Sequence, residues 1–164
     1  MESHMPRMSA RALSFVAAGT LAVVLAACSS EAKPTAAEAD AAKAAAAALF
    51  TGPAAQTASI EMTDLKYSNT ALTAKTGAVL EVSLANKGSI EHDFTLAKIP
   101  GDKAFRVAGK DQTVAAGKNE VHAHLNSGES GAVRLKVSEA GTYEFWCTIA
   151  GHKEAGMRGT LTVQ

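Results

Sequence analysis

From residue 57 to the end, the chain consists of short runs in which apolar and polar positions alternate. An alternation with a period of two places the apolar side chains on one face of a β-strand. Glycine, asparagine and proline residues, which favour turns, separate the runs. Six or more short strands with turns between them favour a β-sandwich or a small barrel. The runs are ASIEMTDLKYS (58–68), AVLEVSLAN (78–86), HDFTLAKI (92–99), GAVRLKVS (131–138), GTYEFWC (141–147) and RGTLTVQ (158–164).

One segment inside this region breaks the alternation. The residues GDKAFRVAGKDQTVAAGKNE (101–120) mix charged, small and apolar positions without a clear period. The segment fits poorly as a strand, and a short helix and an extended loop both agree with its composition.

The first 27 residues differ in character from the rest of the chain. MESHM (1–5) reads as a remnant of a cloning vector, and residues 13–27 form an apolar segment that is too short for a convincing permanent membrane span. The end of this segment, LAAC at 25–28, resembles the bacterial lipobox, in which the cysteine carries the lipid. We therefore interpret 1–27 as a vector remnant plus a lipoprotein signal peptide. We expect Cys28 to be lipidated, which would anchor the protein to a membrane on the extracytoplasmic side, periplasmic or at the cell surface.

Residues 28–56 are rich in alanine and carry no convincing apolar stripe. Ala36 to Phe50 could form a helix on propensity alone, but a helix of about fifteen residues without an apolar stripe is marginal in water. We therefore interpret 28–56 as a flexible linker between the anchor and a folded domain at 57–164. If Cys28 carries lipid, Cys147 is the one remaining thiol of the chain. An exposed thiol is a liability in an oxidising compartment, so we expect burial or a metal to protect Cys147.

The stretch FWCTIAGHKEAGM (145–157) brings a cysteine, a histidine and a methionine together. Four residues separate Cys147 from His152, and four more separate His152 from Met157. A thiolate, imidazoles and a thioether form a soft ligand set that suits copper as it cycles between two oxidation states. The spacing therefore predicts a copper site in this loop.

A second imidazole for this site must come from elsewhere in the domain. His92, His122 and His124 are the candidates. His92 is preferred because it opens a predicted strand, and a ligand from a distant strand would join the loop to the rest of the sandwich.

These residues resemble the cupredoxin, or type 1 blue copper, family. The likeness rests on HDF at 92–94, on the strand GTYEFWC, and on the loop that carries histidine and methionine. It implies an all-β, cupredoxin-like Greek-key β-sandwich over 57–164. It also implies one type 1 copper per chain. Within the family, the loop spacing, the lipobox and the alanine-rich linker are most similar to the auracyanin type. The ligands that the resemblance implies are His92, Cys147, His152 and Met157.

The resemblance also assigns a role to the residue after the first histidine. In the family, an aspartate or asparagine at this place ties its strand to the residue after the cysteine. Asp93 and Thr148 are therefore expected to interact and to hold the ligands in place. The alternative is that Asp93 is a solvated acid at a strand end.

Two residues are candidate ports for an electron. His152 is flanked by small and apolar loop residues, so its ring edge is expected to reach the surface there. Strand alternation turns Trp146 outward, directly beside Cys147, and makes it a second port. The alternative packs the Trp146 ring under the segment 101–120.

His122 and His124 lie two positions apart and would share one face of a strand. Such a pair can bind a second metal, as in multicopper oxidases. Those enzymes use several such pairs and more than one domain, whereas this chain has one pair. We therefore expect the two rings to be solvated or hydrogen-bonded.

The chain carries sixteen basic and sixteen acidic residues, and this balance argues against a nucleic-acid partner. Three classes of function compete: a one-electron carrier, a copper-storage or copper-delivery lipoprotein, and a copper enzyme. Storage proteins often have exchangeable, methionine-rich ligands, but only Met62 and Met157 follow the signal segment. An enzyme would need ligands for a second, catalytic copper.

We therefore expect a monomeric, lipid-anchored one-electron carrier that is not an enzyme. The resemblance implies a redox protein as donor and another as acceptor, such as a membrane quinol oxidoreductase and a cytochrome or a reaction centre.

Overall fold

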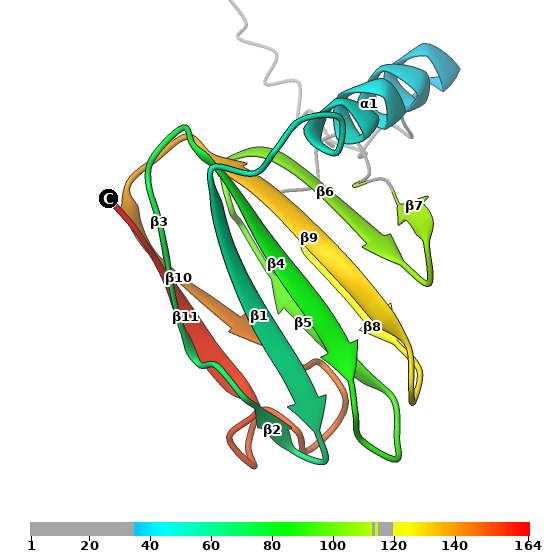
Figure 1. Cartoon of the computed structure of the whole chain (residues 1–164), viewed down its shortest axis with the longest axis vertical. Coiled ribbons are helices and arrows are strands. Elements are labelled where there is room, and N and C mark those ends of the chain that lie inside the picture. The colour runs from blue at the N-terminus through cyan, green and yellow to red at the C-terminus, as the bar shows by residue number, and fades with distance from the viewer. Residues whose placement is uncertain (1–34, 113, 115–119) are drawn as a thin grey trace, which may run out of the picture. The chain divides into compact units, whose positions relative to one another are not determined.

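The computed structural model describes residues 35–112, 114 and 120–164 (Figure 1). The predicted signal segment, Cys28 and the start of the predicted linker lie outside these residues. No helix in the described part is long and apolar enough to cross a membrane. The described elements are α1 (Ala36–Leu49), β1 (Gln56–Thr63), β2 (Lys66–Tyr67), β3 (Ala71–Ala74), β4 (Val79–Asn86), β5 (His92–Leu96), β6 (Gly101–Val107), β7 (Lys110–Gln112), β8 (Val121–Leu125), β9 (Ser130–Val137), β10 (Gly141–Trp146) and β11 (Arg158–Val163).

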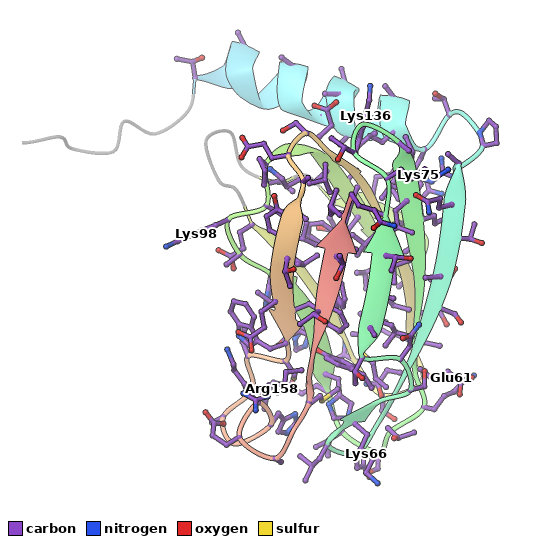
Figure 2. The ribbon with its side chains drawn as sticks, turned by 90° about the vertical axis from the view of Figure 1, so that its left-hand side faces the viewer. Glu61, Lys66, Lys75, Lys98, Lys136 and Arg158 are labelled. Atoms are coloured by element: carbon purple, nitrogen blue, oxygen red, sulfur yellow. The ribbon has the colours of Figure 1, made fainter. Side chains whose placement is uncertain are left out.

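The strands form two sheets that face each other (Figures 1 and 2). One sheet has the order β2-β1-β4-β9-β6-β7, and the other has the order β3-β11-β10-β5-β8. Neighbouring strands are antiparallel, except that β1 runs parallel to β4 and β11 runs parallel to β3. The predicted all-β sandwich is therefore confirmed.

Alternating side chains from both sheets fill the space between them. In β4, Leu80, Val82 and Leu84 are buried, and in β11 the same holds for Leu161 and Val163. Each aliphatic side chain of this size contributes about 1.5–3 kcal/mol when it is fully buried. The period-two pattern of the sequence thus corresponds to one continuous core between the sheets.

The segment that broke the alternation, 101–120, contains two strands instead of a short helix or an extended loop. β6 pairs with β9 along its whole length, and β7 folds back on β6. Positive φ angles at Ala108 (49°) and Gly109 (74°) form the tight turn between them. Only Ala104 in β6 is fully buried. Because the strand buries so few side chains, it leaves almost no period-two signal in the sequence.

The structure also differs from the expected flexible linker, because residues 36–49 form the helix α1. Arg134 of β9 donates hydrogen bonds from Nη1 to the carbonyl oxygens of Leu49 (2.6 Å) and Gly52 (2.5 Å). The guanidinium groups of Arg134 and Arg106 lie 5.0 and 4.4 Å from the centroid of the Phe50 ring. The hydrogen bond to Leu49 satisfies a carbonyl group at the end of the helix, and the cation–π contacts hold the Phe50 ring that follows it. A helix that is marginal alone is therefore held by partners that are distant in sequence.

A buried asparagine shapes the loop that leads to β5. The Asn86 side chain donates to the carbonyl oxygens of Ile90 (2.8 Å) and Leu125 (3.1 Å) and accepts from the N–H of Gly88 (2.9 Å). Ser127 donates a further hydrogen bond to the carbonyl oxygen of Gly88 (2.7 Å). The loop after β4 is thereby fixed, and it delivers the first residue of β5 to a defined position.

Candidate metal centre

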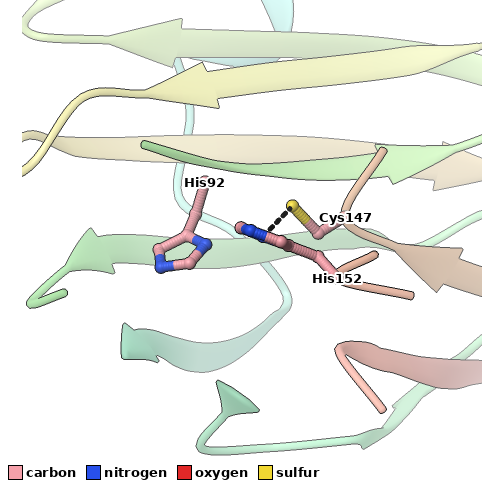
Figure 3. Close-up of side chains that lie close together, drawn as sticks. All are labelled: His92, Cys147 and His152. Atoms are coloured by element: carbon pink, nitrogen blue, oxygen red, sulfur yellow. Dashed lines mark hydrogen bonds between the residues drawn. The ribbon is translucent and has the colours of Figure 1, made fainter. Parts of the chain in front are cut away.

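Three of the predicted ligands meet at one end of the sandwich (Figure 3). His92 is the first residue of β5, Cys147 directly follows β10, and His152 lies in the loop between β10 and β11. Each brings one ligand atom to within 4.8 Å of the others. The sulfur of Cys147 lies 3.4 Å from Nδ1 of His152, and the centroids of the two imidazole rings are 5.1 Å apart. The fold therefore gathers residues from distant parts of the chain into one cluster.

This cluster is almost closed to solvent. His92 and Cys147 have no exposed surface, and His152 is 6% exposed. Burial raises the pKa of the Cys147 thiol. Burial also lowers the pKa of His92, and the neighbouring His152 adds to that shift. Both residues are therefore held in their uncharged forms without a metal, and a metal that binds the sulfur must displace the thiol proton.

Both ring nitrogens of His92 are buried without a hydrogen-bond partner among the described residues. Nε2 lies 3.7 Å from Oδ1 of Asp64, which is beyond hydrogen-bond distance. Buried polar atoms in folded proteins almost always have a partner. A metal ion bound to the His92 ring would give one of these nitrogens the partner that it lacks.

Backbone hydrogen bonds close the loop that carries the remaining ligands. The N–H of Cys147 donates to the carbonyl oxygen of Met157 (3.0 Å), and the N–H of Met157 donates to that of His152 (2.9 Å). Gly151 and Gly156 have φ angles of 84° and 105°, which glycine adopts without strain. Met157 is fully buried in the same core as Cys147. The backbone of Met157 therefore lies directly beside two of the other predicted ligands.

Asp93 joins β5 to the residue after the cysteine. The N–H of Thr148 donates to both carboxylate oxygens of Asp93 at 3.0 Å, and the Thr148 hydroxyl donates to Oδ2 at 2.8 Å. The N–H of Asp93 points at the sulfur of Cys147, 3.5 Å away. The Tyr67 hydroxyl donates to the carbonyl oxygen of Asp93 at 2.5 Å. Asp93 is only 1% exposed, so the alternative of a solvated strand-end acid does not describe it.

Residues 54–164 match the family described as copper binding proteins, plastocyanin/azurin family. The chain belongs to this family. The predicted membership among the cupredoxins is therefore confirmed, and with it the cupredoxin-like sandwich and copper as the cofactor.

Individual relatives agree with this assignment. The copper-resistant cuproprotein CopI of Rubrivivax gelatinosus is 32% identical over 117 residues, which cover 68% of this chain and 68% of CopI. Auracyanin-B of Chloroflexus aurantiacus is 32% identical over 111 residues, which cover 60% of this chain and 47% of auracyanin-B. A solved structure of auracyanin B superimposes with a TM-score of 0.53 at 26% identity, over 70% of this chain and 93% of that chain. The predicted likeness to auracyanin is confirmed by both comparisons.

The donor set of this cupredoxin fits copper. One thiol, two imidazoles and one buried thioether are soft or intermediate ligands, and copper prefers them over hard oxygen donors. His92, Cys147 and His152 are the residues that would hold the ion, with Met157 as the predicted fourth ligand. Asp93 and Thr148 then fix the cysteine-bearing strand from outside the ligand set.

The two predicted electron ports of the cupredoxin differ in their surroundings. His152 keeps a small exposed edge among the exposed residues Ala150, Gly151 and Ala155. Trp146 is half-buried, and its ring lies under Lys153, whose Nζ is 4.3 Å from the ring centroid. Lys153 is also paired with Glu144 at 2.7 Å. The residue that covers Trp146 therefore comes from the ligand loop.

Sequence reasoning missed three residues around the centre. Asp64 faces His92, Tyr67 binds the carbonyl oxygen of Asp93, and the Thr95 hydroxyl donates to Oδ1 of Asp93 at 2.8 Å. None of them belongs to a recognisable motif, because their contacts depend on the packing of strands that are distant in sequence. His122 and His124 do not join the cluster around Cys147, and they lie instead beside Asp93.

Proposed function

We propose that this cupredoxin is a one-electron carrier, held at the extracytoplasmic side of a membrane by a lipid on Cys28. The enclosure of the ligand cluster is the observation that carries the proposal. His92 and Cys147 are fully buried, and only an edge of His152 reaches solvent. An enzyme needs an open position for its substrate, whereas an electron can pass through a closed site. When bound, copper supplies a one-electron cycle between Cu(I) and Cu(II).

The residues around the site would keep the ligands in one arrangement in both oxidation states. Asp93 holds Thr148, and the backbone bonds among Cys147, His152 and Met157 hold the loop. Little reorganisation is then needed when an electron enters or leaves. The buried core around the cluster excludes water from the sulfur.

The face around His152 is the proposed docking site for redox partners. Ala150, Gly151 and Ala155 are small and exposed, so a partner can approach the imidazole edge closely. We propose a membrane quinol oxidoreductase as donor and a cytochrome or a reaction centre as acceptor, and we propose that the carrier acts as a monomer. Support for these partners comes from the resemblance to the auracyanin type.

A role in copper storage or delivery is the second candidate. It is favoured by one observation, the 32% identity to a protein named as a copper-resistant cuproprotein. The two roles make opposite demands on the site, because a store must release its ion whereas a carrier must retain it. The closed cluster favours the carrier.

Optical spectroscopy of the protein loaded with Cu(II) tests the proposal. A carrier should show an intense blue thiolate-to-copper band that bleaches on reduction and returns on oxidation, with the copper retained against a competing chelator. Cys147→Ser is the matched control, because it replaces the thiol by a hydroxyl of similar size and should lose the band while the sandwich stays folded. A protein without the band, or one that surrenders copper readily to the chelator, would exclude the carrier function and leave storage or delivery.

A further inference from the structure

A second group of metal-ligating side chains lies outside the cluster around Cys147. β5 and β8 pair so that Asp93 is opposite His124 and Thr95 is opposite His122. Residues opposite each other on paired strands project to the same face of a sheet. The side chains of His122 and His124 are 45% and 40% exposed, whereas the intervening Ala123 is buried. Both imidazoles therefore stand on the outer face of the sheet, open to ions in solution.

The two rings are arranged as a pair. Their centroids are 6.4 Å apart and their planes differ by 28°. The ligand atoms of His122, His124 and Asp93 all lie within 4.8 Å of one another. Glu91, which directly precedes β5, places Oε2 3.2 Å from Nε2 of His124. Two imidazoles thus stand beside two carboxylates, a combination that neutralises and binds a divalent cation.

Thr95 determines which nitrogen of His122 is available. The Thr95 hydroxyl lies 2.8 Å from Oδ1 of Asp93 and 2.8 Å from Nδ1 of His122. A carboxylate can only accept, so the single hydroxyl proton goes to Asp93, and Nδ1 of His122 must carry its own proton to donate to Thr95. This leaves the lone pair of the His122 ring on Nε2. A hydrogen bond that fixes the tautomer and the orientation of an imidazole is typical of metal-binding histidines.

Asp93 is a neighbour of this group rather than a ligand in it. Its oxygens already accept from the N–H and the hydroxyl of Thr148 and from the hydroxyl of Thr95. Few lone pairs remain on it for a metal. In the described part of the chain the Glu91 carboxylate contacts His124, and its side chain is 56% exposed, so it is free to coordinate.

We propose that His122 and His124, with the Glu91 carboxylate that contacts His124, form a second metal site, which takes a divalent cation of the Zn²⁺ or Cu²⁺ class, with Asp93 as a negative charge within 4.8 Å of both imidazoles. Imidazole and carboxylate ligands favour these ions over Cu(I). The sequence alone indicated solvated or hydrogen-bonded rings, since the register that brings Glu91 and Asp93 beside the histidines is not visible in it. The inference does not depend on the proposed electron-carrier function.

Calorimetric titration of the copper-loaded protein with Zn²⁺ tests this site. The blue site is then already filled, and an unchanged blue band during the titration shows that Zn²⁺ does not displace its copper. We expect one saturable Zn²⁺ equivalent in the parent protein and none in the His122→Ala/His124→Ala double variant. Glu91→Gln should weaken binding by about 10-fold. Glu139→Gln, which neutralises an exposed acid on the turn before β10, is the matched control and should bind as the parent does.

A second measurement locates the ion independently of the variants. In the reduced, diamagnetic protein, Zn²⁺ should shift the imidazole NMR signals of His122 and His124 and leave those of His92 and His152 in place. The proposal is overturned if the double variant binds Zn²⁺ as tightly as the parent, if the parent shows no saturable binding, or if the shifted signals belong to the other histidines.

Discussion

The carboxylate of Asp93 holds Thr148 through both its backbone N–H and its hydroxyl, and so ties β5 to the residue that follows Cys147. The three contacts measure 2.8–3.0 Å, and they join the buried Asp93 to the exposed Thr148. A hydrogen bond to a charged group contributes about 1.5–3 kcal/mol. This link therefore matters both for the stability of the domain and for the position of the cysteine.

Asp93→Ala should lower the free energy of unfolding of the copper-free protein by about 2–4 kcal/mol, because it leaves the N–H of Thr148 without an acceptor. Urea unfolding measures the change. Thr148→Ala is the matched control: it removes the hydroxyl contact but keeps the N–H bond, and should cost only about 1 kcal/mol. Equal losses for both variants would show that the backbone contact is not the important one.

Asp64→Asn should raise the reduction potential of the copper site. The Asp64 carboxylate faces Nε2 of His92, and Ser89 holds it there with two hydrogen bonds of 2.9 Å. The approach of Asp64 to His92 requires a glycine at position 88. A Cβ there would lie 2.6 Å from Asp64 Oδ1 and 2.9 Å from His92 Nε2. A negative charge behind a ligating imidazole makes the imidazole more basic, which favours Cu(II). Removal of the charge therefore favours Cu(I).

Redox titration of the blue band measures this shift. Asp111→Asn is the control, because Asp111 is an exposed acid that pairs with Arg106 at 2.5 Å on the β6–β7 hairpin. Its replacement should leave the potential nearly unchanged. A potential that stays constant in Asp64→Asn would mean that the carboxylate does not act on His92.

Met157→Gln should retain copper but lower the reduction potential. The amide oxygen is a harder ligand than the thioether, and it stabilises Cu(II) relative to Cu(I). Met157 is fully buried, so a polar replacement needs the metal as its partner. An unchanged potential in a protein that still binds copper would show that Met157 is not a ligand. Met157→Leu is the matched control, because it removes the thioether without adding an oxygen. Met62→Gln would not serve, since Met62 lies in the core.

Ala150→Glu should slow electron exchange with the natural partner strongly, because it places a charge beside the exposed edge of His152. Trp146→Leu should slow the exchange only weakly, since Lys153 covers part of that ring. Stopped-flow kinetics compare the two variants. The region 57–164 has twelve basic and twelve acidic residues, so the rate should depend only modestly on salt. A larger effect of Trp146→Leu would move the docking site to the strand face.

Local sequence was sufficient for some parts of the structure and insufficient for others. Cys147, His152 and Met157 lie within one short loop, so their spacing alone indicated copper. The second histidine had to be chosen among three candidates. His92 was preferred because it begins a predicted strand, and it is the candidate that lies beside Cys147. The position of Asp64 beside His92 could not be predicted. It arises because the turn after β1 packs against the loop after β4.

The same distinction explains the two differences in the fold. The strand β6 is stabilised by its pairing with β9, while its side chains show almost no burial pattern. The helix α1 ends where Arg134 donates hydrogen bonds to the carbonyl oxygens of Leu49 and Gly52. In both cases the stabilising partner is far away in the sequence, and local propensity carries no trace of it.

The strand β1 runs from one end of the sandwich to the other. β1 begins at Gln56, next to Leu80 at the start of β4, and ends at Thr63, just before the residue that faces His92. The eight residues of this strand span about 26 Å. Figure 2 shows the two ends, with Lys75 and Lys136 at one and Lys66 and Arg158 at the other. The chain therefore enters the sandwich a full strand length away from the ligand cluster, and the face around His152 is clear of the point where β1 begins.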